Sequence, residues 1–270
     1  MRRFTILFAA PWLALLSLIA VPASAQDMGS PATRLKAALD VLDAGIASAD
    51  KSKGLPTLSN PEIATQYAAI TASLKQIDTP SFPIDGMATF EICGAINNTF
   101  LKYITHGQEA LEPFKNNSAL YNQKLQALGD ANGNRYQNEV TILVASTLHC
   151  FGAHFPFWQS LYASLKPEDL DEKRKGGARQ MRSAMLNMAS LTLSIAADTS
   201  VSLANREKLL KALNLDAVAF ASILSLAQRD TFLGTLRAVK ARVPPSLAVQ
   251  LGPIETAYSD RKCVAICTTD

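Results

Sequence analysis

The chain has 270 residues, of which 48% are hydrophobic, 18% charged and 7% aromatic, and its net charge is +3. This apolar content and low net charge exclude an intrinsically disordered chain, and 13 glycines and 13 prolines exclude a collagen-like one. Four cysteines are too few for a small scaffold built on disulfides. Alanine and leucine make up more than a quarter of the residues, which favours an all-helical globular protein.

The first 25 residues have the pattern of a bacterial secretory signal peptide. Arg2 and Arg3 precede an apolar stretch that runs to Val21, and a small-residue Ala-Ser-Ala pattern ends at Ala25. An uncleaved membrane anchor is the alternative, but prolines within and directly after the apolar stretch favour cleavage. We therefore expect cleavage after Ala25 by the general secretory route, which would place the mature protein in the periplasm or outside the cell.

Cleavage at this site would remove two arginines and no acidic residue, which lowers the net charge to +1. A nearly neutral mature chain has no electrostatic attraction to nucleic acid or to an anionic membrane. The sequence indicates no second apolar run of transmembrane length. We expect an exported soluble protein that binds no nucleic acid and has no stable membrane insertion after cleavage.

Helix start signals and apolar residues at helical spacing recur in the first half of the chain. Ser30 and Asn60 each precede a proline, a pattern typical of a helix N-terminus. Leucines and isoleucines then follow three and four residues apart. The expected helices span about 31–50, 60–77, 86–112 and 117–128, and the sequence GDANGN at 129–134 predicts a loop.

The second half contains the clearest helical stripe, over about 135–165. Eight residues share one face there: Tyr136, Val140, Leu143, Thr147, Cys150, His154, Phe157 and Leu161. Pro156 lies within this stretch and predicts a kink or an early end of the helix. Further helices are expected at about 167–195, 205–213, 216–243 and 246–258.

Together these elements predict an all-α fold, an antiparallel bundle of about seven to nine helices braced by disulfides. Residues 26–270 are expected to form a single helical domain. The stretch 199–205 is the best candidate for a boundary between two lobes, although its signal is weak.

The four cysteines of an exported chain are expected to be oxidised, and they allow three pairings. Cys93 and Cys150 lie on apolar faces of two long predicted helices, whereas Cys263 and Cys267 are four residues apart near the end of the chain. We favour the pairs Cys93–Cys150 and Cys263–Cys267; the other two pairings would tie the tail to the bundle. A bridge that closes a loop of 57 residues stabilises the fold by about 4 kcal/mol in the chain-entropy model. The C-x-x-x-C spacing of the second pair differs from the C-x-x-C redox motif, so we predict a structural role.

Histidine and methionine side chains form one candidate metal site. The candidate ligands are His149, His154, Met181, Met185 and Met188. Imidazole and thioether groups bind zinc or copper, and the three methionines share one helical face. The simpler interpretation is that the methionines and His154 pack in the core, in which case no cofactor is needed.

The densest aromatic cluster surrounds Pro156. It consists of Phe151, Phe155, Phe157, Trp158 and Tyr162. Such a cluster lines an apolar ligand cavity, forms a partner surface, or packs in the core around a kink.

The sequence contains no G-x-S-x-G, H-E-x-x-H, di-iron E-x-x-H, P-loop or G-x-G-x-x-G pattern. This favours a non-enzymatic binding or protein-interaction bundle of the periplasm that acts through the aromatic cluster. Its partner would be a protein or an apolar small molecule. The alternative is a periplasmic protein that handles copper or zinc through the histidine and methionine side chains.

Overall fold

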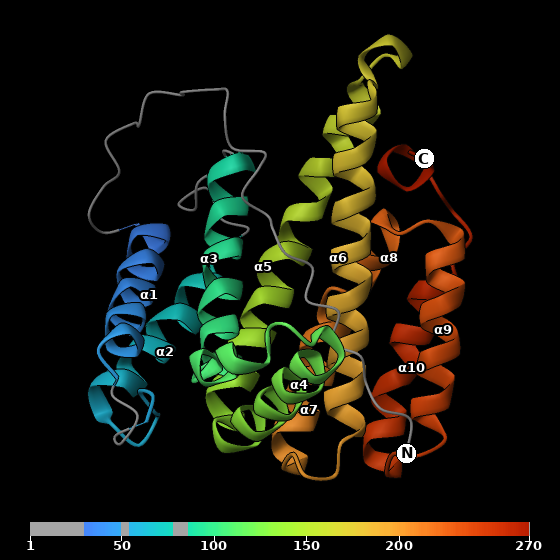
Figure 1. Cartoon of the computed structure of the whole chain (residues 1–270). Coiled ribbons are helices and arrows are strands. Elements are labelled where there is room, and N and C mark those ends of the chain that lie inside the picture. Colours follow the sequence, from blue (N-terminus) through green and yellow to red (C-terminus); the bar gives the residue numbers. More distant parts are fainter. Residues whose placement is uncertain (1–29, 50–53, 78–85, 270) are drawn as a thin grey trace.

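The computed structural model describes residues 30–49, 54–77 and 86–269 of the chain (Figure 1). The predicted signal peptide at 1–25 lies outside the described residues. Within these ranges the secondary structure is helical and includes no strand, which confirms the predicted all-α fold. The helices are α1 (Pro31–Ala47), α2 (Pro61–Leu74), α3 (Gly86–Ile104), η2 (Gln108–Phe114), α4 (Ser118–Arg135), α5 (Gln137–Ser164), η3 (Pro167–Asp169), α6 (Glu172–Ala197), α7 (Leu203–Leu215), α8 (Ala217–Ile223), α9 (Leu226–Lys240), α10 (Pro245–Ser259) and η4 (Ala265–Thr268), where η marks short 3₁₀ helices.

Helix α5 lies at the centre of the fold. In Figure 1, α1, α2 and α3 lie on one side of α5, and α6, α9 and α10 lie on the other. Helix α5 packs directly against α2, α3, α7 and α8. Buried side chains from both sides meet in one hydrophobic core, in which Leu143 and Leu148 of α5 are fully buried.

The length and apolarity of α5 would also allow it to span a membrane, and it is the one such helix in the described part of the chain. The sequence analysis expected no second apolar run of transmembrane length. Helix α5 has the length and composition of such a run, so this expectation is wrong. Inside the bundle, 67% of the most apolar window of α5 is buried. Burial of this kind is expected for the core helix of a bundle.

Side-chain caps start the first helices where the sequence predicts them. The Ser30 side chain accepts a hydrogen bond from the N–H of Thr33 (3.1 Å), and the Asn60 side chain accepts one from the N–H of Glu62 (2.9 Å). In both helices the residue after the cap is proline, which lacks the N–H that would otherwise need a partner.

Residues 129–134 were expected to form a loop, and this prediction is wrong because α4 continues through them to Arg135. The side chain of Asn132 donates hydrogen bonds to the carbonyl groups of Ile104 (3.0 Å) and His106 (2.9 Å), at the end of α3. These tertiary bonds hold α4 in place despite its loop-like composition. The break between this helix and the next lies instead at Tyr136, beyond the predicted loop.

Two predicted helices are interrupted. Helix α3 ends at Ile104, and Gly107 then adopts a positive φ of 87°, which a helix cannot contain. The predicted helix at 216–243 divides into α8 and α9, because Ser225 and Gln228 form a reciprocal capping box that starts a new helix. The predicted bundle size of seven to nine helices is therefore not confirmed, since the described ranges contain ten α-helices.

The loop between α1 and α2 is held by polar side chains of α3 and of the region where α5 begins. Three hydrogen bonds hold it: Leu55 N–H to Tyr136 Oη (3.1 Å), Leu58 N–H to Glu139 Oε1 (2.7 Å) and Tyr103 Oη to the Pro56 carbonyl (2.5 Å). Burial raises the pKa of the Tyr103 hydroxyl above its usual value, so this group remains a donor.

Both disulfides have the pairing that the sequence favours. Cys93 of α3 is bonded to Cys150 of α5 with a Cα separation of 5.5 Å, and both residues are fully buried. Cys263 is bonded to Cys267 in the tail that follows α10. The first bridge fixes α3 beside the central helix, and the second closes a small ring within the tail.

Helix α5 approaches the junction of α7 and α8 very closely at Gly152. A Cβ added to Gly152 would lie 2.8 Å from Asp216 Oδ1 and closer still to the Cβ of that residue. Asp216 also forms an ion pair with His149 of α5, with 3.1 Å between Nδ1 and Oδ2. The absence of a side chain at Gly152 therefore permits this packing.

We expect the substitution Gly152→Ala to destabilise the protein by about 1–3 kcal/mol, the usual range for overpacking. At an open helical position the same change should stabilise, because alanine has the higher helix propensity by about 1 kcal/mol. Gly234→Ala in α9 is the matched control, since nothing lies within 4 Å of its added Cβ. Urea unfolding measures both free energies, and a Gly152→Ala variant as stable as the control would contradict the close contact.

Candidate functional site

The predicted aromatic cluster on α5 is divided between the core and the surface. Phe151 and Phe155 are buried, with exposed fractions of 4% and 1%. Phe155 packs edge-to-face on Phe220 of α8 (5.0 Å between ring centroids), and Phe151 packs in the same way on Phe90 of α3 (5.4 Å). These two predicted site residues therefore belong to the core.

The next turn of α5 carries a second group of rings that reaches the surface. The ring of Phe157 is stacked on that of His154, with 5.2 Å between centroids. Trp158 meets His154 edge-to-face at 5.9 Å and Phe90 at 6.0 Å. His154 is buried beneath these rings, while Phe157 is exposed.

The apolar face of α5 continues beyond the part that other helices cover. On this face Tyr136 and His154 are 2% and 6% exposed, whereas Phe157 and Leu161 are 41% and 38% exposed. The helix itself runs on to Ser164 with Pro156 inside it, so of the two predicted effects of Pro156, a kink or an early end, the early end does not occur. The same stripe is therefore core at one end and surface at the other.

This exposed end lies where α5 and α6 extend past their neighbours, as Figure 1 shows. The Tyr162 hydroxyl donates a hydrogen bond to the carbonyl of Arg174 (3.0 Å), which joins the end of α5 to the start of α6. The contacts of Phe90 place the first turns of α3 at the same end, where Met87 is 47% exposed. We define the apolar tip as Met87, Phe157, Trp158 and Leu161.

Sequence reasoning missed Met87 as part of this surface. The bridge between Cys93 and Cys150, with α3 antiparallel to α5, brings the start of α3 to the outer half of α5. That pairing was the one sequence signal that could have led to Met87.

Charged residues of both signs adjoin the apolar tip around the start of α6. The first turns of α6 carry four basic residues and one acidic residue: Lys173, Arg174, Lys175, Arg179 and Glu172. A hydrogen bond from Lys175 and the charge of Arg179 hold the pKa of Glu172 below its usual value. Glu168, Asp169 and Asp171 lie directly before these residues and are also exposed, so the surface beside the tip carries charges of both signs.

The histidine and methionine residues of the metal alternative have other contacts in the structure. His149 pairs with Asp216, and His154 lies beneath Phe157. Met181 and Met185 are buried in the core, and Met188 packs against it. Over the described ranges, no group of three or more His, Cys, Asp and Glu side chains could hold a metal ion. These contacts give the metal alternative no support.

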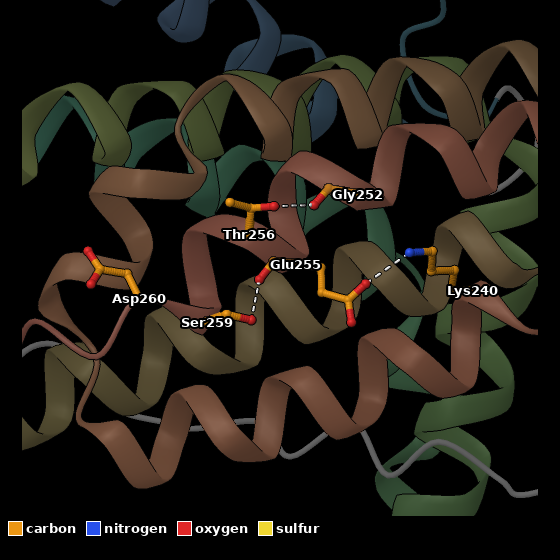
Figure 2. Close-up of a pocket in the computed structure, with 6 residues that line it drawn as sticks. All are labelled: Lys240, Gly252, Glu255, Thr256, Ser259 and Asp260. Carbon is orange, nitrogen blue, oxygen red and sulfur yellow. Dashed lines mark hydrogen bonds and ion pairs between the residues drawn. The ribbon is translucent and has the colours of Figure 1, made fainter.

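A shallow, open depression lies between α9 and α10 (Figure 2). Its lining residues are Lys240, Gly252, Glu255, Thr256, Ser259 and Asp260. Lys240 and Arg237 form ion pairs with Glu255 (2.9 and 3.0 Å), and these cations hold the pKa of Glu255 below its usual value. The hydroxyls of Thr256 and Ser259 donate to carbonyl groups of their own helix. The polar groups of the depression are thus bonded to one another and do not converge on a ligand.

The division of the aromatic cluster predicts unequal effects of truncation on stability. Phe155→Ala is expected to cost about 3–5 kcal/mol, as for a large buried ring, because it opens a cavity against α8. Phe157→Ala should cost less than about 1 kcal/mol, because much of the ring is already in contact with water. Chemical unfolding of the two variants measures the difference, and similar losses would show that the tip is part of the core.

Comparisons with protein-family models, with curated proteins and with solved structures found no match. The functional interpretation of this chain therefore rests on its own residues and geometry.

Proposed function

We propose that this chain is an exported, periplasmic, non-enzymatic helical-bundle protein that binds a partner protein through the apolar tip. The observation that carries the proposal is the α5 stripe, which remains apolar after the covering helices end. Exposed, clustered apolar side chains of this kind are typical of interaction surfaces. Trp158 and Phe157 add large aromatic rings, which often dominate binding energy at interfaces.

The shape of the tip favours a protein over an apolar small molecule. The tip lies on helix ends that project from the bundle, whereas small apolar ligands usually bind in concave sites. A stripe on a helix is suited to packing against a second amphipathic helix. The charges of both signs around the start of α6 would fix the register of that partner helix, because opposite charges on the two helices attract.

The predicted export supports the same proposal. Two disulfides are typical of proteins that leave the cytoplasm, and the sequence pattern of residues 1–25 predicts the route.

Photo-cross-linking in the periplasm of the source bacterium tests the partner proposal. A benzophenone amino acid at Phe157 or Leu161 is expected to form a discrete higher-mass adduct. The matched control is the same group at Val249 of α10, which is 76% exposed on another helix. Equal cross-linking yields at Phe157 and Val249, or no adduct at the tip, would contradict the proposal. An adduct with a small molecule would show that the tip binds an apolar ligand and not a protein.

Export is tested separately by the mass of the purified protein. We expect the chain recovered from the periplasmic fraction to begin at Gln26, because the signal pattern places cleavage after Ala25. Intact mass spectrometry measures this directly. Recovery of a membrane-bound chain that retains Arg2 and Arg3 would show an anchor instead.

A further inference from the structure

The Cys263–Cys267 disulfide is more exposed to solvent than the Cys93–Cys150 disulfide. Cys267 is 1% exposed, while Cys263 is partly exposed. Both cysteines of the Cys93–Cys150 bridge are fully buried between α3 and α5. The tail bridge is therefore the more accessible of the two disulfides to a thiolate from solution.

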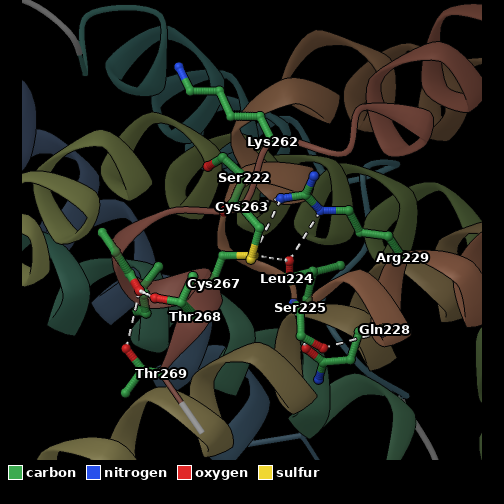
Figure 3. The surroundings of a disulfide bond; sticks show 12 residues. Ser222, Leu224, Ser225, Gln228, Arg229, Lys262, Cys263, Cys267, Thr268 and Thr269 are labelled. Atoms are coloured by element: carbon green, nitrogen blue, oxygen red, sulfur yellow. Dashed lines mark hydrogen bonds between the residues drawn. A yellow bond between two sulfur atoms is a disulfide. The ribbon is translucent and has the colours of Figure 1, made fainter.

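A buried guanidinium group lies beside the inner sulfur of this bridge. Arg229 of α9 is 1% exposed, and its Nη2 lies 3.6 Å from Cys267 Sγ (Figure 3). Its other hydrogen bonds go to the carbonyl groups of Leu224 (3.1 Å), Asp260 (2.5 Å) and Ser222 (3.5 Å). Burial lowers the pKa of Arg229, and the charge of Asp260 opposes this, but arginine remains protonated in proteins. A full positive charge thus faces Cys267 from within the core.

We propose that Cys263–Cys267 is a redox-active disulfide that undergoes thiol–disulfide exchange with a dithiol reductant. The thiolate of the reductant attacks Cys263 Sγ and forms a mixed disulfide. The bond between Cys263 and Cys267 breaks, and its electron pair leaves on Cys267 Sγ as a thiolate beside Arg229. The second thiol of the reductant then attacks the mixed disulfide and releases Cys263. Two electrons pass to the protein, which becomes a dithiol, and the reductant becomes a disulfide.

The direction of attack follows from exposure and charge. Cys263 is the accessible sulfur, and exchange is faster when the leaving sulfur is stabilised as a thiolate. Lys262 and Arg261 precede Cys263, but Asp260 adjoins them and Arg261 is paired with Asp230 (2.6 Å), so exposure and the charge of Arg229 decide the direction of attack. The carbonyl oxygen of Leu224 lies 3.0 Å from Cys267 Sγ, but it already accepts a hydrogen bond from Arg229.

The backbone of the ring also favours opening. Ala265 has a φ of 50°, a left-handed conformation that is costly for a residue with a Cβ. Reduction removes the covalent closure that holds Ala265 in this conformation. The tail nevertheless remains attached, since Arg182 of α6 donates hydrogen bonds to the carbonyl groups of Ile266 (2.7 Å) and Thr269.

The first experiment compares the two disulfides within the same folded protein. The oxidised chain is incubated with dithiothreitol without denaturant, quenched in acid, alkylated and analysed by peptide mass spectrometry. We expect Cys263–Cys267 to be reduced at least about 100-fold faster than Cys93–Cys150, with unchanged helical circular dichroism. Equal rates, or reduction of the tail bridge only when helicity is lost, would overturn the proposal.

The second experiment tests the role of Arg229 through a matched pair of single-cysteine tails. Cys263→Ser leaves the Cys267 thiol, and Cys267→Ser leaves the Cys263 thiol. Thiolate absorbance at 240 nm is expected to show a pKa for Cys267 at least one unit below that of Cys263, which should lie near the ordinary value of about 8.5. A Cys267 pKa equal to or above that of Cys263 would overturn the proposed leaving group. This comparison leaves Arg229 in place, so it does not depend on a variant of a buried arginine that fails to fold.

Discussion

The need to cover one long apolar helix from water determines most of this structure. Helix α5 has 28 residues, and its side chains face neighbours on several sides. At about 25 cal/mol for each Å² of apolar surface buried, its coverage is a leading source of stability. The close contacts along α5 serve this packing: Gly152 lets the α7–α8 junction approach, and Cys150 fixes α3.

The apolar tip is the place where this coverage ends. Because Phe157 and Leu161 continue the stripe of α5, they have the chemistry of core residues at a surface position. Core-like side chains in water lower the solubility of a protein unless they are covered by a partner. The charged residues of both signs around the start of α6 would both maintain solubility and restrict the choice of partner.

Local signals in the sequence predicted helix starts and disulfide pairs, because caps and apolar faces depend on nearby residues. Ser30 and Asn60 cap the helices that they were expected to cap, and Cys93 faces Cys150. The GDANGN segment at 129–134 was misread because its helical state depends on Asn132 bonds to a distant part of the chain. The periodicity of α5 placed Phe157 in line with buried residues, but periodicity carries no information about how far the neighbouring helices extend. The exposed part of the candidate site could therefore be found only from the structure.

The hydrogen bonds around the loop between α1 and α2 also affect the order in which the chain folds. Leu55 and Leu58 donate to side chains 81 residues further along the chain, at Tyr136 and Glu139. Most contacts of a helical protein are local and form early, whereas bonds that close long loops form late. The hairpin of α1 and α2 can thus reach its final position only after α5 is in place. Although α1 and α2 precede α5 in the chain, we expect this earlier hairpin to dock onto the central helix late in folding.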